Sequence, residues 1–356
     1  MFTQLFQPGV RLKRILTLPL CFGPSAAAGH EAWLLTPEEV EALAAAPMPT
    51  AFASHVWLGL ATLVGGLVTL TALRVERTFA RLEDRLTVPL VRSALGLGPL
   101  ILRLALAAML VLAALGGLPR HGTAMWATPT LFVPDMQLSL VSPWWSWLAA
   151  AQIFLAGLLA VGLLIRWVGA ALIGFAVLGV LVFGTAFLSY APHFAAPGLM
   201  LVLAGAGIFS LDRMIGRDGW IELPAYQVQK LWRLCQILLG AGFIYLAVVH
   251  KLLQPTLLIA IIDHSTLPTF GLPLPVMALI MTGIEVVCGV LLVLGRLVRP
   301  VAMLLIVAFS VFAVALSETP FFHANLYGAM AFLVLSGRAL PSPQPRSKRR
   351  LRRALA

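Results

Sequence analysis

Charged side chains are scarce in this chain: Asp, Glu, Lys and Arg make up 11% of its 356 residues, whereas 60% are hydrophobic. Together with a mean hydropathy of +0.95, this excludes an ordinary soluble domain, in which about 25% of residues are charged. Acidic residues are the scarcest, and the net charge is +11. The basic residues lie in short loops between apolar stretches and in the C-terminal tail. This is the positive-inside pattern of a membrane protein and argues against a nucleic-acid partner.

Cysteine is also nearly absent. Two of the three cysteines, Cys235 and Cys288, lie within apolar stretches and have no CxxC partner, so disulfide exchange and iron–sulfur binding are not indicated. The sequence lacks a P-loop, a dinucleotide-binding fingerprint and a nucleophile elbow. The longest segments between apolar stretches, 119–143 and 252–274, are apolar enough to lie on the membrane or to cap a helical bundle. We therefore expect no soluble catalytic domain.

Residues 1–29 have the features of an export signal. Basic residues precede the apolar stretch 15–22, which is too short for a span of about 20 residues, and a small-residue run follows at 25–29. This order predicts a signal peptide cleaved near Ala28 or Gly29. The alternative is an uncleaved amphipathic arm that lies on the membrane.

Residues 30–96 are expected to form a periplasmic N-terminal helix, an extra span and a cytoplasmic loop. Thr36-Pro37-Glu38-Glu39 is a capping box with proline at the first helical position. It predicts a short helix that ends near Pro47.

Nine apolar runs follow the predicted signal, and we expect an all-α polytopic membrane protein with about nine transmembrane helices. The spans are placed at 51–74, 96–118, 144–164, 167–188, 196–211, 231–251, 275–295, 300–317 and 324–337.

The basic loops orient these spans. The C-terminal tail, 341–356, is rich in Arg and Lys and places the C-terminus in the cytoplasm by the positive-inside rule. Counting back through nine spans places the N-terminus in the periplasm, so the chain is predicted to lie in the lipid bilayer of a bacterial inner membrane. All seven histidines then lie on the periplasmic side: His30, His55, His121, His193, His250, His264 and His323.

The chain contains an internal duplication. A constant shift superposes Arg103 on Arg233 and His193 on His323, and the pattern His-x4-Gly-x-Met occurs twice. Residues 97–211 and 228–340 therefore read as two tandem four-helix units. Because each unit has an even number of spans, the two are parallel and not inverted. The span at 51–74 lies outside the repeat, and Arg103 and Arg233 are expected to be interfacial anchors.

The second unit carries the residues of a family resemblance. Its first span ends in GFIYLAVVHKL (242–252), and the pattern Glu-x3-Gly-x2-Leu-x2-Gly-x3-Arg runs from Glu285 across the second span. This resembles the DoxX-like superfamily of four-helix membrane proteins, which includes DoxD, a small membrane subunit linked to thiosulfate:quinone oxidoreductase. The resemblance implies a duplicated DoxX-like bundle and a link to quinone chemistry. The first unit departs from the pattern, with His121 in place of Lys251 and Gln152 in place of Glu285.

Glu285 is the one carboxylate placed deep in a span. An acidic side chain there costs about 2.5–3.5 kcal/mol unless it is protonated, paired or hydrated. A functional interpretation makes it a proton relay or a contact for a quinone head group. Alternatively, it is a neutral residue hydrogen-bonded to a neighbouring helix, as Gln152 can be. Lys251 lies at the outer end of its span, where we expect it to snorkel to the interface without pairing with Glu285.

The histidines are candidates for cofactor binding. His193 and His323 recur at equivalent repeat positions, and His250 adjoins the family motif. Ligation of haem or a metal requires at least two of them to converge, supported by acceptors such as Asn325. If cleavage follows Gly29, His30 becomes the N-terminal residue, whose amine and imidazole can chelate copper. For His55, His121 and His264 we expect surface positions.

Three functions are compatible with these features. The first is a membrane subunit of a quinone-linked redox system with its chemistry on the periplasmic side, which receives electrons from a periplasmic partner protein. The second is a proton-coupled solute or metal transporter, because parallel repeats and an intramembrane ionisable residue are common in carriers. The third is a non-catalytic assembly or scaffold protein. The sequence leaves the oligomeric state open.

Overall fold

The computed structural model describes residues 34–340 apart from 84, 86–87, 89–90, 92–93, 122 and 217–222. The predicted signal peptide, His30 and the basic tail 341–356 lie outside the described residues. The described residues form helices and loops; their single β-bridge joins Thr130 to Gln137. The prediction of an all-α protein is therefore confirmed.

The long helices follow the predicted spans. Short helices cap the ends of the bundle: α1 (Pro37–Ala44), α2 (Thr50–Ala53), α6 (Leu138–Val141), η4 (Pro143–Trp145), α9 (Thr185–Leu188), α11 (Leu211–Met214), η6 (Ala247–Leu252), α13 (Pro255–Asp263) and η7 (Pro320–His323). The longer helices are α3 (His55–Leu82), α5 (Leu97–Leu115), α7 (Trp147–Val161), α8 (Ile165–Phe183), α10 (Ala191–Ala204), α12 (Ala225–Leu246), α14 (Leu274–Leu294), α15 (Val298–Ala315) and α16 (Ala324–Ser336).

Six of the described helical segments are long and apolar enough to cross a bilayer: α3, α5, α8, α12 with η6, α14 and α15. The helices at the other three predicted spans are shorter: α7, α10, and η7 with α16. At 1.5 Å per residue, α7 is only about 22 Å long, less than the roughly 30 Å hydrocarbon core. A multi-pass membrane protein is thus supported, while the count of nine spans stays a prediction.

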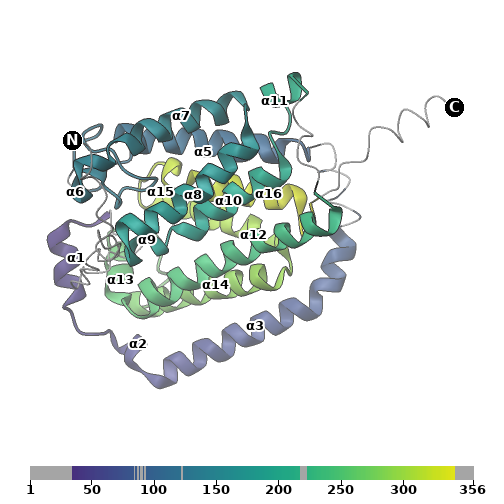
Figure 1. Ribbon diagram of the computed structural model, residues 1–356. Coiled ribbons are helices and arrows are strands. Elements are labelled where there is room, and N and C mark those ends of the chain that lie inside the picture. Colours follow the sequence, from purple (N-terminus) through teal and green to yellow (C-terminus); the bar gives the residue numbers. More distant parts are fainter. Residues whose placement is uncertain are drawn as a thin grey trace, which may run out of the picture.

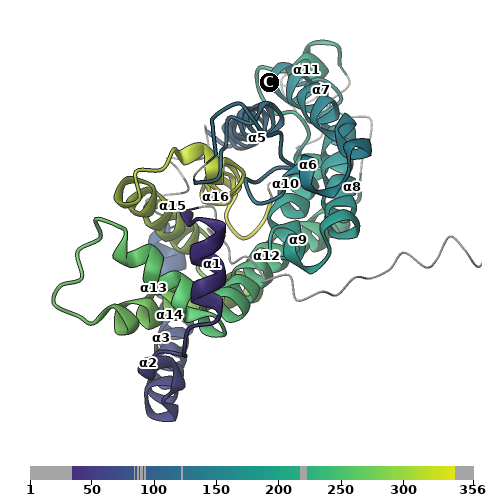
Figure 2. The ribbon, with the colours of Figure 1, turned by 90° about the vertical axis from the view of Figure 1, so that its left-hand side faces the viewer.

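The long helices form one bundle, which Figure 1 shows from the side and Figure 2 close to end-on. Helices α5 and α7 pack together, as do α8 and α10, α12 and α14, and α15 and α16. The most extensive packing between the halves of the sequence is that of α5 on α16 and of α10 on α12. We call the end with loop 119–137 and the buried histidines the histidine end, and the end with turns 162–164 and 295–297 the arginine end.

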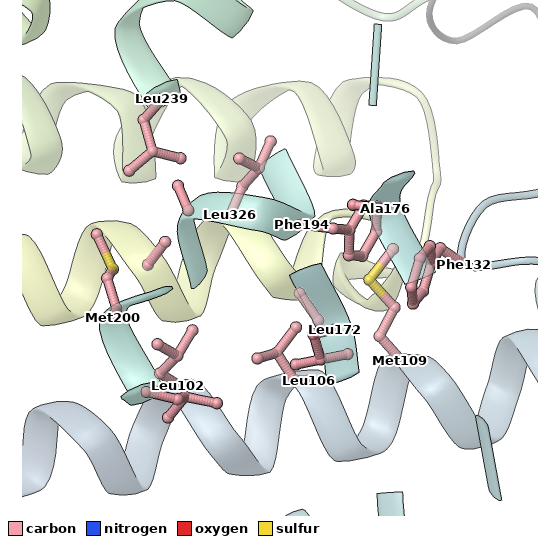
Figure 3. Close-up of a cluster of buried hydrophobic side chains, with 14 of the residues drawn as sticks. Leu102, Leu106, Met109, Phe132, Leu172, Ala176, Phe194, Met200, Leu239 and Leu326 are labelled. Atoms are coloured by element: carbon pink, nitrogen blue, oxygen red, sulfur yellow. The ribbon is translucent and has the colours of Figure 1, made fainter. Parts of the chain in front are cut away.

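Large apolar side chains fill the middle of the bundle, and Figure 3 shows part of this core. Glycines allow two helix pairs to approach closely. A Cβ atom added at Gly169 would lie 2.5 Å from the carbonyl oxygen of Gly198, and one added at Gly240 would lie 2.5 Å from that of Gly289. Close backbone approach at small residues is a common source of helix association in membranes.

The two turns at the arginine end share an unusual backbone geometry. Gly162 and Leu164 have φ of 72° and 56°, and Gly295 and Leu297 have 61° and 48°. The first member of each pair ends a helix in the left-handed conformation that suits glycine, and the second precedes the next helix.

Each turn also receives a buried or half-buried arginine. Arg103 donates to the carbonyl oxygen of Leu159 (3.5 Å), near the end of α7, and to those of Ile208 and Phe209; Arg233 donates to those of Leu292 (2.8 Å) and Val293, near the end of α14. Arg103 is only 1% exposed, so it is buried in the protein and is not the interfacial anchor that was expected. Arg233 is half-buried, and for it an anchoring role stays a prediction.

Loop 119–137 caps the histidine end, which is one of the two positions expected for it. Phe132 is fully buried and its ring stacks on Phe194 of α10, with ring centroids 4.1 Å apart. The side-chain amide of Gln152 donates to the carbonyl oxygen of Thr130 (2.8 Å) and its oxygen accepts from the Phe132 N–H (3.0 Å). Residues 130–134 of the loop are thus part of the core.

Helix α3 lies along one side of the bundle, as Figures 1 and 2 both show. It has no buried residue and packs against α14. At the arginine end, Glu76 pairs with Arg296 (2.6 Å) and Glu83 pairs with Arg299. At the other end α2 buries Phe52 against α14 and α13. Most of the apolar surface of α3 is therefore left for lipid.

Candidate functional site

Lys251 and Glu285 form an ion pair near the histidine end of the second half of the chain. The Lys251 Nζ atom lies 2.7 Å from Glu285 Oε2, and the two side chains are 16% and 15% exposed. The prediction that Lys251 snorkels to the interface without a carboxylate partner was therefore wrong. Glu285 is paired with a basic side chain in this arrangement, which removes most of the cost of placing a lone carboxylate in a span.

The relative depth of two helices explains why the pair can form. The contact between Gly240 and Gly289 fixes α12 against α14 at one level. From that level Lys251 lies about 16 Å toward the histidine end and Glu285 about 6 Å, at 1.5 Å per residue. The remaining offset of about 10 Å is bridged by a lysine that reaches inward and a glutamate that reaches outward.

His250 precedes Lys251 and points to a different partner. Its Nε2 atom lies 2.5 Å from the Ser189 hydroxyl oxygen, and both residues are buried. Its ring meets that of Tyr245 edge-on, with centroids 6.1 Å apart. Ser189 belongs to the first half of the chain, so this hydrogen bond crosses between the halves. His250 and Lys251 lie in η6, a six-residue π-helix, a geometry often found at functional sites.

His193 and His323 lie in the same buried region. They are 2% and 8% exposed, and an aromatic row connects them through two phenylalanines. The ring centroids of His193 and Phe243 are 4.8 Å apart, those of Phe243 and Phe309 are 6.1 Å apart, and those of Phe309 and His323 are 5.7 Å apart. The Asn325 side chain donates to the His193 carbonyl oxygen (3.0 Å), so Asn325 holds the backbone of α10 and not the imidazole.

The other three described histidines are exposed: His55, His121 and His264. Their expected surface positions are confirmed, and burial separates them from His193, His250 and His323. The described residues contain no group of three or more His, Cys, Asp or Glu side chains that could hold a metal ion. His30 lies outside the described residues, so copper binding at the N-terminus stays a prediction.

Some residues of this site could not be predicted from the sequence. Ser189 is a neutral residue, 61 positions from His250, and no spacing pattern connects the two. Tyr190 and Asp135 form a second polar contact nearby, with the tyrosine hydroxyl donating to the carboxylate (3.0 Å). Asp135 also pairs with Arg120 (3.5 Å). A sequence search for polar residues in spans misses these groups because they lie in caps and loops.

The site combines an ammonium group, a carboxylate and an imidazole within a largely apolar bundle. The ammonium donates hydrogen bonds, the carboxylate accepts them, and the imidazole does either. Such a set can bind a polar head group and exchange protons with it. No protein-family model, curated protein or solved structure matches this chain, so the site is interpreted from its own geometry.

Proposed function

We propose that this protein is a DoxX-like inner-membrane subunit of a quinone-linked redox system, with its quinone site at Lys251 and Glu285. In this proposal the chain has nine spans, the histidine end faces the periplasm, and a periplasmic redox protein exchanges electrons with the bound quinone. The arginine end then faces the cytoplasm.

Four matched features support two parallel tandem units within this architecture. Both arginine-end turns pair a left-handed glycine with a left-handed leucine. Arg103 and Arg233 bind carbonyl groups beside those turns. Arg166 donates to the Val202 carbonyl (2.6 Å), much as Arg299 donates to that of Val334 (2.8 Å). The fourth feature is packing: α5 on α16 and α10 on α12 are equivalent contacts under an exchange of units.

The ion pair of Lys251 and Glu285 is the observation that carries the redox proposal. Ion pairs and carboxylates inside membrane spans commonly mark proton or substrate pathways. The two side chains are 16% and 15% exposed, so neither is sealed inside the protein. The buried contact of His250 with Ser189 adds a second proton-exchanging group beside it.

The chemistry of these residues fits a quinone. Lys251 can donate a hydrogen bond to a carbonyl oxygen of the ring, and Glu285 can accept a proton from the corresponding hydroxyl of the reduced form. A bound quinone supplies two-electron, two-proton redox chemistry. His250 holds its imidazole against Ser189, where it can pass a proton toward the histidine end.

Replacing the carboxylate tests the proposal. We expect Glu285→Gln to weaken binding of a short-chain ubiquinol or menaquinol, the reduced forms whose hydroxyl donates to the carboxylate, to the purified chain in nanodiscs by at least about tenfold, because a hydrogen bond to a charged group contributes roughly 1.5–3 kcal/mol. In washed membranes the same variant should slow quinone-dependent electron transfer while its membrane abundance is unchanged.

A matched control is available at the opposite end. Glu76→Gln removes the carboxylate of the ion pair with Arg296, the same chemical change at a site far along the bundle, and should leave quinone binding as it is. Unchanged quinone binding and electron transfer in Glu285→Gln would contradict the redox assignment.

A proton-coupled carrier is the second candidate, and one observation favours it. The Ser189 contact places His250 at the junction of the two halves, which is where tandem-repeat carriers bind their substrates. A purified chain that binds no quinone but accumulates a solute or metal in vesicles under a pH gradient would favour this function over the redox one.

A further inference from the structure

A cavity of about 320 Å³ lies at the arginine end of the second half of the chain. Its walls come from α3, from the turn between α14 and α15, and from the end of α16. The wall residues include two carboxylates, two guanidinium groups and the start of α15: Glu76, Glu83, Arg299, Arg338, Leu297 and Val298.

The charges around this cavity do not cancel. Glu76 pairs with Arg296, and Glu83 pairs with Arg299. Arg299 also donates to the carbonyl oxygens of Val334 (2.8 Å) and Leu335 (3.3 Å), so its guanidinium is fully engaged. Arg338 is exposed and forms no ion pair with any described residue. The cavity therefore has one positive charge in excess.

In the first half of the chain, a carboxylate occupies the equivalent place, beside the turn that precedes α8. There the carboxylate of Asp212 accepts hydrogen bonds from the backbone N–H groups of Leu164 (2.8 Å) and Ile165 (2.9 Å), at the start of α8. The N-terminus of a helix attracts negative charge because its N–H groups are unpaired and the helix dipole is positive there.

The second half has the same backbone at this turn, because Leu297 adopts the left-handed conformation of Leu164. The side chain of Leu297, the N-cap residue, cannot cap α15, and among the described residues no carboxylate accepts from the start of α15 as Asp212 does from the start of α8. Leu297 and Val298 instead line the cavity. The position taken by the Asp212 carboxylate in the first half thus corresponds to the cavity in the second.

We propose that this cavity binds the phosphate of an anionic phospholipid such as phosphatidylglycerol. The phosphate would meet the start of α15 and the Arg338 guanidinium, and its single negative charge would balance the excess. The apolar wall residues, Ala80 and Val298 among them, suit the glycerol region of the lipid. Helix α3 contributes Glu76 and Ala80 to one wall, and it also exposes Phe79 and Leu82, so acyl chains can continue along this helix. This site is independent of the proposed quinone site.

Thermal unfolding of the purified full chain tests the site. We expect dioctanoyl phosphatidylglycerol to raise the unfolding midpoint more than dioctanoyl phosphatidylethanolamine does at equal concentration, because only the former brings net negative charge. In Arg338→Gln the concentration needed for half of this effect should rise about tenfold, as expected for loss of a charge-assisted hydrogen bond. Arg338→Lys should recover part of the affinity.

Arg213→Gln is the matched control, because Arg213 is also an exposed arginine at the arginine end but does not line the cavity. It should respond to phosphatidylglycerol like the unmodified chain. Equal stabilisation by the two lipids, or an identical response of Arg338→Gln and Arg213→Gln, would overturn the proposal. An equal shift produced by inorganic phosphate at the same concentration would overturn the assignment to a lipid. Native mass spectrometry, which counts bound lipids, checks each variant independently of its stability.

Discussion

Gln152 and Glu285 occupy matching places on α7 and α14, and each holds part of the histidine end in position. The oxygen and the nitrogen of the Gln152 side-chain amide both form hydrogen bonds with loop 119–137. This uncharged side chain therefore holds the loop in place. Glu285 instead holds the ammonium of Lys251, and a proton can neutralise it. One amino-acid difference therefore separates a structural contact from one that can take part in proton exchange.

The structural contact can be tested by removing it. We expect Gln152→Ala to lower the free energy of unfolding by about 1–3 kcal/mol, because the Thr130 carbonyl and the Phe132 N–H would be left buried without partners. Hydrogen exchange of the amides in loop 119–137 should rise. Gln227→Ala is the control, since Gln227 bonds the exposed Tyr226 hydroxyl only. Equal exchange in the two variants would show that Gln152 does not hold the loop.

For single residues, the sequence predicts that Glu285 belongs to the candidate site, but it does not predict which side chains lie around it. Glu285 stands out because a charge in an apolar run is costly. Its pairing with Lys251 depends on how far α12 is shifted along α14, and that shift is set by the contact of Gly240 with Gly289. Ser189 escapes prediction because it is neutral and comes from the other half of the chain.

Among the elements, helix α1 covers the histidine end beside the candidate site. Val40 of this helix and Leu35, just before it, pack on Leu257 and Ile261 of α13, and the Thr256 hydroxyl donates to the Leu43 carbonyl oxygen (2.9 Å). Helix α13 in turn packs on η6, which contains His250 and Lys251. The predicted capping box is present, with Glu39 accepting from the Thr36 N–H (2.8 Å).

This capping box makes the start of α1 sensitive to acid. Hydrogen bonds from the Thr36 backbone and side chain hold the pKa of Glu39 below its ordinary value of 4.5. The stabilisation is therefore complete above pH 4.5 and is lost as the pH falls through the lowered pKa. We expect the protection factors of the α1 amides to fall on acidification over this range. In Glu39→Gln they should stay constant, and a fall of the same size there would contradict the assignment.

Helix boundaries differ from the predicted ones where polar residues continue a helix. The span predicted at 51–74 ends at its first arginine, whereas α3 continues to Leu82. Glu76 and Glu83 extend it because Arg296 and Arg299 pair with them. Hydropathy alone cannot predict this extension, since the stabilising partners come from a distant turn. The π-helical form of η6 was likewise not predictable from hydropathy.

For the whole molecule, the two ends of the bundle differ in chemistry. The buried histidines and the Lys251 pair gather at one end, and Arg103, Arg233 and the cavity with Arg338 gather at the other. By the positive-inside rule the arginine end should face the cytoplasm. This polarity is what the proposed functions require, because quinone chemistry and lipid binding are assigned to opposite sides.

Cysteine labelling tests the orientation. His264 and Arg213 are exposed at the histidine and arginine ends, respectively. In spheroplasts, a membrane-impermeant maleimide should label His264→Cys directly, but should label Arg213→Cys only after lysis. The parent chain provides the background: of its three cysteines, Cys235 and Cys288 are buried, and Cys21 lies in the predicted signal peptide. Labelling of Arg213→Cys before lysis, with His264→Cys protected, would reverse the proposed topology.

The burial of Phe132 also constrains the order of assembly. This residue is made before α10, yet its ring stacks on Phe194 of that helix. The native packing of Phe132 therefore cannot form until α10 has been synthesised. Helix α5 waits longer still, because it packs on α16 near the end of the described chain. The histidine end consequently reaches its final packing only after these later helices have been made.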